Sequence, residues 1–214
     1  MKRRYWESNL RLQSINKRIL VATNNTDKLR EIRQILDGTG WEVVGLNKLP
    51  PYPEPIEDGE TLAENALIKA REGFRQSGIL TLADDTGLEV DALDGRPGVY
   101  SARYAGENAT YSDNVNLLIR EMSGVPEPMR TARFRTVMAL VGKDSEECWE
   151  GVAEGMIISE SIGGKGFGYD PVFYSPELGQ TFAEASSKAK NRVSHRGRAL
   201  QKLVDRLKKL KYGS

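Results

Sequence analysis

The chain has 214 residues, and its 31 lysines and arginines nearly balance its 30 aspartates and glutamates, for a formal net charge of +1. It contains one cysteine, Cys148, and one histidine, His195. These low counts exclude an internal disulfide and a zinc site built from several Cys and His ligands. With 39% hydrophobic and 29% charged residues, the composition is that of a folded globular protein rather than a disordered one.

The N-terminal segment is basic but lacks the apolar stretch of a secretory signal. We predict that residues 1–17 are an extension outside the fold and that residues 18–214 form a single domain. The longest apolar runs, such as Ile19 to Ala22, are too short to span a membrane. We therefore expect a cytoplasmic protein without a membrane partner.

The first part of the predicted domain alternates strands and helices. Residues 18–23 and 41–46 are two short apolar strands, and the apolar spacing between them predicts an amphipathic helix that ends at Gly38. Prolines between residues 50 and 55 exclude regular structure from the next loop, which ends in an acidic group that includes Glu57.

A second helix begins at Thr61, where Glu64 completes a capping box. The apolar residues 79–83 predict a buried strand. This strand runs into Asp84-Asp85-Thr86-Gly87, which we interpret as a loop at the strand end. The alternating residues 88–93 then predict an exposed strand.

The remaining elements are a helix over residues 115–122, strands near 131–141 and 148–159, and a glycine-dense loop over 163–168. A terminal helix follows, which Ser194 can cap. The alternation predicts an α/β fold around a central sheet. The sheet is predicted to be mixed because two strand pairs look hairpin-connected. Ligands of such sheets bind at strand ends, where the acidic residues are expected.

The segment from Thr23 to Lys28 places a hydroxyl, amides and a lysine where a helix begins. Free backbone N–H groups and the helix dipole there favour an anion, especially a phosphate. The simpler interpretation is an ordinary N-cap followed by a solvated lysine.

Asp84 and Asp85 are adjacent carboxylates that repel each other and need a counter-charge. A hard cation such as Mg²⁺ supplies it, and Glu57 is a candidate for a further ligand. Alternatively, Asp85 caps a turn while Asp84 faces solvent, and Glu57 belongs to a solvated charge cluster.

The glycine-dense loop is not a phosphate-binding Walker A loop, because Lys165 is followed by Gly166 rather than Ser or Thr. It presents Phe167 and Tyr169 beside Asp170, and aromatic faces and a carboxylate suit a nucleobase. A hairpin loop with core aromatics is the alternative.

The segment from Lys190 to Arg196 places His195 and Arg196 in the first turn of the terminal helix, where the helix dipole disfavours cations. An anionic or carbonyl-bearing ligand would explain their presence. A solvated basic face, or a nucleic-acid-binding module that uses the basic terminal helix, is the alternative, against which the near-zero net charge argues.

Taken together, these segments resemble the inosine triphosphate pyrophosphatase family over Arg18 to about Leu210. The motifs occur in the family's order: T-x-N-x-x-K from Thr23, E-N-A-x-x-K-A from Glu64, A-D-D-[ST]-G-L from Ala83, G-x-P-G-x-Y-S-A-R-Y from Gly95, F-G-Y-D-P from Phe167 and S-H-R from Ser194.

The resemblance implies an elongated α/β fold of two lobes with the active-site cleft between them, and a homodimer. It also implies Mg²⁺-assisted attack of water on the α-phosphorus of ITP, dITP or XTP, which yields the monophosphate and pyrophosphate and cleanses the nucleotide pool. No specific nucleic-acid partner is expected.

The implied site residues fall into three groups. The triphosphate would be held by Thr23, Asn25, Lys28 and Lys69. Asp85 would be the general base and, with Glu57, a metal ligand, while Thr86 contacts substrate. The purine would be bound by Phe167, Gly168, Tyr169, Asp170, Lys190, His195 and Arg196. Two departures stand out: Lys165 occupies a position where a small residue is expected, and Lys188 competes with Lys190, which only its spacing favours.

Overall fold

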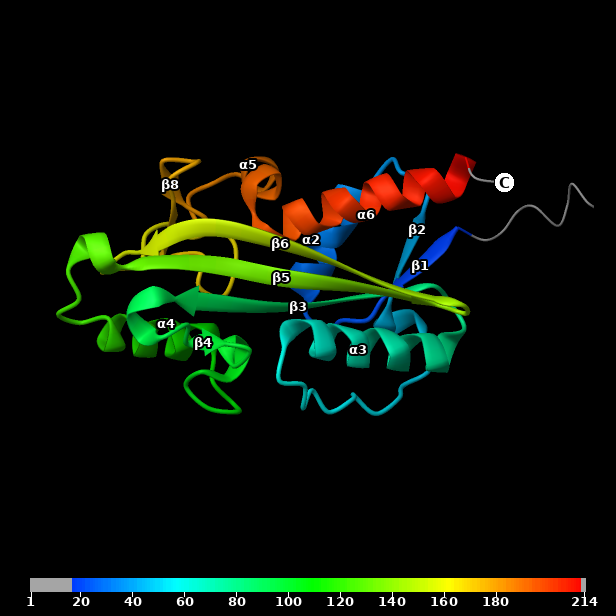
Figure 1. Cartoon of the computed structure of the whole chain (residues 1–214), viewed down its shortest axis with the longest axis horizontal. Coiled ribbons are helices and arrows are strands. Elements are labelled where there is room, and N and C mark those ends of the chain that lie inside the picture. Colours follow the sequence, from blue (N-terminus) through cyan, green and yellow to red (C-terminus); the bar gives the residue numbers. More distant parts are fainter. Residues whose placement is uncertain (1–16, 213–214) are drawn as a thin grey trace, which may run out of the picture.

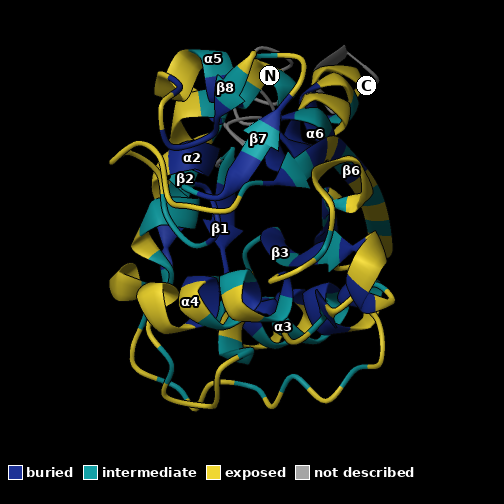
Figure 2. Cartoon of the chain, turned by 90° about the vertical axis from the view of Figure 1, so that its left-hand side faces the viewer, coloured by how far each residue is buried: buried dark blue, intermediate teal, exposed yellow. Residues whose placement is uncertain are grey.

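The computed structural model describes residues 17–212, which form a long twisted sheet with helices on two sides (Figure 1). The predicted extension, residues 1–17, lies outside the described residues except for Lys17. In both views α3 and α4 lie on one side of the sheet, and α2, α5 and α6 lie on the other. Figure 2 shows buried residues gathered on strands and helices between the two helical layers, whereas β6 also carries exposed residues.

The elements alternate along the chain largely as predicted. The strands are β1 (Arg18–Val21), β2 (Glu42–Gly45), β3 (Thr81–Val90), β4 (Pro97–Gly98), β5 (Thr131–Gly142), β6 (Ser145–Ile157), β7 (Phe173–Ser175) and β8 (Gln180–Thr181). The α-helices are α2 (Thr26–Leu36), α3 (Leu62–Ser77), α4 (Tyr111–Glu121), α5 (Ser187–Val193) and α6 (His195–Tyr212). Short 3-10 helices are η1 (Leu46–Lys48), η2 (Asp91–Leu93), η3 (Ser101–Arg103) and η4 (Glu127–Met129).

The sheet is mixed, as the sequence predicts. Its strand order is β2-β1-β3-β5-β6-β7-β8, with β4 beside β3. Strand β1 is parallel to β2 and β3, and the other pairs are antiparallel. No helix in the described part of the chain is long and apolar enough to cross a membrane.

Local signals in the sequence place several helix ends correctly. Thr61 and Glu64 form the predicted capping box of α3, and Gly78 ends that helix with a left-handed φ of 65°. Ser194 caps α6, because its Oγ accepts a hydrogen bond from the Gly197 N–H at 3.1 Å. Helix α5, which Ser186 caps, was not predicted.

The predicted loop over residues 84–87 is wrong, because β3 runs through these residues to Val90 and pairs with β5 over its whole length. The predicted strand over 88–93 is correct only for residues 88–90, which continue β3 with Leu88 and Val90 fully buried rather than exposed, and η2 replaces it from Asp91. Gly87 does not form a turn. It lets the backbone at Gly98 approach β3 closely, because a Cβ at residue 87 would lie 2.7 Å from the Gly98 carbonyl oxygen.

The other edge of β3 is only partly paired. Strand β1 covers it at Thr81 and Leu82, and β4 covers it again at Leu88 and Glu89. Between these pairs, residues 83–87 face no strand of the described chain on this side. The gap opens at the carboxyl end of β1, where α/β sheets commonly bind ligands.

Candidate active site

A cavity of about 660 Å³ lies at this gap. It is lined by the turn after β1, the proline-rich loop, β3, the start of α4, the glycine-dense loop and the start of α6. Every residue of the three predicted groups lines it: Thr23, Asn25, Lys28, Glu57, Lys69, Asp85, Thr86, Phe167, Gly168, Tyr169, Asp170, Lys190, His195 and Arg196.

The turn after β1 has the local structure of a helix cap. The Asn25 Oδ1 accepts hydrogen bonds from the backbone N–H groups of Asp27 and Lys28, at 3.0 and 3.1 Å. Asn25 is therefore an N-cap, as the simpler interpretation has it. Lys28 is not a solvated lysine, because its Nζ lies 3.2 Å from Asp84 and its side chain is 17% exposed. Burial lowers the pKa of Lys28, and Asp84 opposes that shift.

The pleat of β3 sends its two aspartates to opposite sides of the sheet. Asp84 faces α2 and α6, where it contacts Lys28 and lies 3.0 Å from the Arg196 Nη2. Asp85 faces α3, where the Lys69 Nζ donates to its Oδ1 at 2.9 Å. Each carboxylate therefore has a basic partner of its own, which supplies the counter-charge that the sequence predicts.

Asp84 does not face solvent, because it is 2% exposed. Burial by itself would raise the pKa of this carboxyl, but the charges of Lys28 and Arg196 outweigh it and lower the pKa. Its Oδ1 is buried without a hydrogen-bond partner among the described residues. Asp84 is thus ionised and held inside the protein.

Lys69 joins Asp85 to the acidic loop, because its Nζ also lies 2.6 Å from Glu57 Oε2. Burial would lower the pKa of Lys69, but Asp85 and Glu57 outweigh burial and raise it. Glu57 therefore points at the cavity rather than belonging to a purely solvated cluster.

The donor set around Lys69 suits a magnesium ion. Two carboxylates, Asp85 and Glu57, contact the same ammonium group, and both line the cavity. No cluster of three or more His, Cys, Asp or Glu side chains that could hold a metal occurs among residues 17–212. Mg²⁺ needs only one or two carboxylates when phosphate oxygens and water complete its shell, so the residues fit this ion.

The glycine-dense loop wraps its backbone around Asp170. The Asp170 Oδ2 accepts hydrogen bonds from the Phe167 N–H at 2.8 Å and from the Lys190 Nζ at 2.6 Å. Gly166 has a φ of 74°, and a Cβ there would collide with the Asp170 carboxylate. Burial raises the pKa of Asp170 and outweighs the opposing charge of Lys190.

The two aromatic residues of this loop lie in different surroundings. Tyr169 is 5% exposed, packs in a hydrophobic core cluster, and its hydroxyl donates to the Ser101 carbonyl oxygen at 2.9 Å. Phe167 lies beside the cations of the cavity, with its ring centre 4.8 Å from the Lys190 Nζ. Tyr169 thus matches the core interpretation, whereas Phe167 offers its ring to a ligand.

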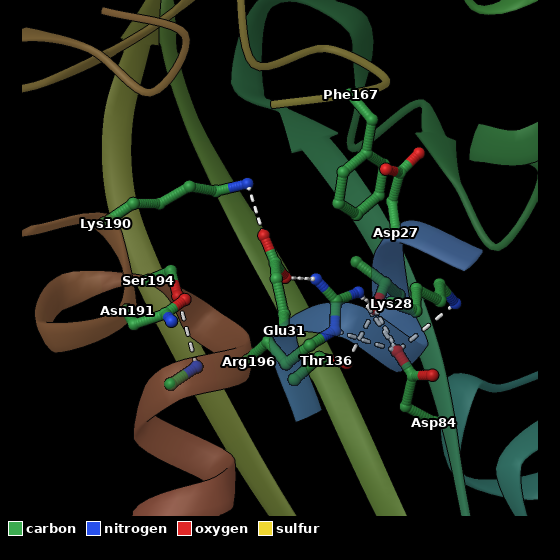
Figure 3. Close-up of polar contacts among 12 residues, drawn as sticks. Asp27, Lys28, Glu31, Asp84, Thr136, Phe167, Lys190, Asn191, Ser194 and Arg196 are labelled. Atoms are coloured by element: carbon green, nitrogen blue, oxygen red, sulfur yellow. Dashed lines mark hydrogen bonds and ion pairs between the residues drawn. The ribbon is translucent and has the colours of Figure 1, made fainter. Parts of the chain in front are cut away.

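Glu31 was missed by the sequence predictions and connects the cations of the site (Figure 3). Its carboxylate accepts from the Lys190 Nζ at 2.9 Å and from the Arg196 Nη1 at 2.6 Å. Burial would raise the pKa of Glu31, but the charges of Arg196 and Lys190 outweigh it and lower the pKa. Its position three residues after Lys28, on the inward face of α2, was a usable signal.

The two candidate lysines lie in different surroundings. Lys190 is buried and faces the cavity, whereas Lys188 is exposed. The buried carboxylates also explain the cation at the start of α6, since Arg196 is compensated by Asp84 and Glu31. The two interpretations made from the sequence, a ligand or a solvated basic face, did not include these internal carboxylate partners.

His195 is a neutral, buried ring. It stacks on Phe134 with ring centres 4.6 Å apart, and its Nδ1 has no hydrogen-bond partner in the described structure. Burial, reinforced by the charges of Arg196 and Lys190, holds the pKa of His195 well below its usual value. Its polar edge is available to a ligand of the cavity.

Other lining residues were not among the predicted site residues, although two of them lie within the motif that begins at Gly95. They are Tyr52 of the proline-rich loop, Ser101 and Arg103 of η3, and Tyr111 at the start of α4.

Comparisons with known proteins agree on one family. The model of the Ham1 family matches residues 19–206. The chain is 50% identical over 191 residues to the dITP/XTP pyrophosphatase of Geobacter sulfurreducens, covering 89% of this chain and 96% of that protein. It is 47% identical over 194 residues to the enzyme of the same name from Desulforamulus reducens, covering 90% and 96%.

A solved structure described as a nucleoside-triphosphatase and dITP/XTP pyrophosphatase, from Mycobacterium abscessus, is 43% identical and superposes with a TM-score of 0.70, covering 87% of this chain and 98% of that one. The Ham1 protein of Staphylococcus aureus is 36% identical and superposes with a TM-score of 0.80, covering 89% and 98%.

Proposed function

The chain belongs to the Ham1 family, and on this premise we propose that it hydrolyses dITP, ITP and XTP to the nucleoside monophosphate and pyrophosphate. One structural observation supports the proposal independently of the names of the relatives. A helix N-terminus, a carboxylate with a lysine, and an aromatic segment with buried cations line one cavity. These are the groups that a phosphate, a reacting water and a purine require.

Asp85 is proposed as the general base. Lys69 donates to its Oδ1 at 2.9 Å and the Asn65 Nδ2 donates to its Oδ2 at 3.4 Å, which fixes the carboxylate while Oδ2 keeps a lone pair that can accept a proton from water. The oxygen of that water forms a bond to the α-phosphorus, and the bond from this phosphorus to the leaving pyrophosphate breaks. Lys28 and Lys69 offset the negative charge that develops on the phosphate oxygens.

Asp85 and Glu57 are the residues that would hold Mg²⁺, which supplies charge neutralisation at the phosphates when bound. The other proposed phosphate contacts are Thr23, Asn25 and the free N–H groups of the first turn of α2. Thr86, which also lines the cavity, is proposed to contact the substrate.

Base selection is proposed to rest on hydrogen-bond donors at the opposite end of the cavity. Phe167 offers a stacking face, and Lys190, His195 and Arg196 offer donors from α5 and α6. A 6-oxo purine presents an acceptor to these donors, whereas the 6-amino group of adenine presents none, and such a mismatch of polar groups gives strong discrimination.

A single domain of two lobes, with the cleft at the gap beside β3, is the proposed organisation. It is supported by separate core clusters, one around α4 with β7 and another around α2 with α6. A homodimer acting on the cytoplasmic nucleotide pool is proposed from the family resemblance. A nucleic-acid-binding role has less support, because Lys190 and Arg196 are buried and paired with carboxylates.

The test is a panel of nucleoside triphosphates with Mg²⁺, scored separately for pyrophosphate and orthophosphate. We expect pyrophosphate from dITP, ITP and XTP at a kcat/KM about 100-fold or more above that for ATP. Chelation of the divalent cation should abolish release. Orthophosphate as the first product, or equal use of ATP, would contradict the proposal.

A further inference from the structure

Tyr111 lies between the two ends of the proposed nucleotide site. Its hydroxyl oxygen accepts a hydrogen bond from the Asn25 Nδ2 at 2.9 Å, and Asn25 caps the helix of the phosphate end. Its ring centre lies 6.0 Å from that of Phe167, the aromatic residue of the base end, with the planes inclined by 40°. Tyr111 also lines the cavity and is 46% exposed.

The backbone around Tyr111 is held firmly. It is the first residue of α4, directly after Thr110, which forms a capping box with Asp113. Asn114, 2% exposed, ties this end of α4 to η3, because its Nδ2 donates to the Ala102 carbonyl and its Oδ1 accepts from the Ala105 N–H. The ring therefore stands on a firmly held helix start, and the hydrogen bond from Asn25 orients its hydroxyl.

A nucleotide that places its base at Phe167 and its phosphates at Asn25 must place its sugar between them. Tyr111 is the residue that contacts one side chain from each end. Resting on the proposed function, we infer that Tyr111 is the sugar-contacting residue of the site. Its ring packs against the sugar, and its O–H, which has no acceptor among residues 17–212, donates to a sugar oxygen.

The oxygen concerned is one that ribose and 2′-deoxyribose share. The proposed substrates include dITP, which lacks the 2′-hydroxyl, and XTP, which carries it. A contact that is made with both substrates must therefore involve atoms that the two sugars share. Tyr111 thereby accepts either sugar and leaves discrimination to the base end of the cavity.

The test is calorimetric binding of dIMP, IMP and inorganic tripolyphosphate to the wild type, Tyr111→Phe and Tyr111→Ala. We expect Tyr111→Ala to weaken dIMP and IMP equally, by about tenfold or more, from lost packing and a lost hydrogen bond. Tyr111→Phe keeps the ring and should weaken both about threefold. Tripolyphosphate has no sugar, so its Kd should stay within about twofold in both variants.

Three results would overturn the inference. Unchanged binding of dIMP to Tyr111→Ala would show that Tyr111 does not contact the sugar. An equal loss of tripolyphosphate binding would show that Tyr111 acts through Asn25 on the phosphate end. Unequal losses for dIMP and IMP would show that it reads the 2′-position instead of shared atoms.

The controls separate this inference from the proposed function. None of the three ligands contains the phosphate anhydride bond at the α-phosphorus that the enzyme would cleave. The binding comparison therefore decides the role of Tyr111 even if the wild type releases no pyrophosphate from dITP, a result that would reject the function alone. A wild type that binds no dIMP would overturn the sugar contact as well. Tyr100→Phe, at an exposed tyrosine outside the cavity lining, should leave all three Kd values unchanged.

Discussion

Asp84 and Asp85 are neighbours in the chain but belong to different kinds of environment. Asp84 is closed in by Lys28, Arg196 and Thr86, and through Arg196 it joins Glu31 and Lys190 in a buried network. Asp85 faces the cavity and has Lys69 as its one close ionic contact among the described residues.

The difference follows from the two-residue period of a strand, which gives adjacent side chains opposite faces. A carboxylate that is buried among basic side chains holds them in place, and its removal leaves buried charges uncompensated. A carboxylate with an oxygen open to the cavity is available to water or a cation. We therefore assign Asp84 to positioning and Asp85 to chemistry.

The largest expected effect is on catalysis at Asp85. Asp85→Asn removes the proposed base and a cation ligand, and kcat for pyrophosphate release from dITP should fall by about 10³-fold or more. Its thermal unfolding midpoint should stay within about 3 °C of the wild type, because only one close ion pair is lost. Substantial residual turnover would require another base.

The complementary change is Asp84→Asn, which leaves Lys28 and Arg196 without their shared carboxylate. The free energy of unfolding should fall by about 3 kcal/mol, which lowers the Tm by about 6 to 12 °C for a chain of this size. Denaturant melts of both variants provide the measurement. A variant as stable as the wild type but inactive would place Asp84 in the chemistry and break the distinction.

A smaller effect is expected at Glu57, on the Asp85 side. Glu57→Gln removes one proposed cation ligand but keeps Asp85, so the Mg²⁺ concentration for half-maximal activity should rise by about tenfold. Glu60→Gln, at an exposed position of the same loop outside the cavity lining, is the matched control and should not shift that concentration. Equal Mg²⁺ dependence of both variants would remove Glu57 from the metal site.

The smallest effect concerns His195, beside the Asp84 network. Its folded-state pKa is lowered by burial, so below about pH 6.5 the unfolded chain binds a proton that the folded chain does not. Stability should therefore fall as pH decreases, by about 1.4 kcal/mol between pH 7.5 and 5.5.

Urea unfolding at these two pH values gives the measurement. His195 is the only histidine of the chain, so His195→Phe, which keeps a ring against Phe134, should lose this pH dependence. If the slope persists in the variant, another group that titrates in this range causes it.

Much of the site could be predicted from the sequence because its signals are local. Asn25 and Ser194 cap helices through hydrogen bonds to residues two or three positions away, and such patterns appear directly in the chain. The motif order that resembles the pyrophosphatase family selected the residues that line the cavity, although their individual roles stay predictions.

The same local reasoning failed at residues 84–87, where two aspartates, a threonine and a glycine favour a turn in isolation. Strand β5 overrides that preference, because it pairs with β3 residue by residue from Thr81 to Val90. Gly87 was taken for loop chemistry, but the close approach of Gly98 is what requires a residue without a side chain.

By itself, the sequence determined the α/β alternation, the helix caps and the residues of the candidate site, since these depend on periodicity, on neighbours a few positions apart and on short motifs. Only the tertiary structure decided which aspartate faces the cavity, that Lys190 rather than Lys188 enters it, and that Glu31 joins Lys190 to Arg196. The contacts of Glu31 link residues 159 and 165 positions apart. Charges so far apart in the sequence can compensate each other only after folding has brought α2 and α6 together. The sequence pattern does not show that these two helices are in contact.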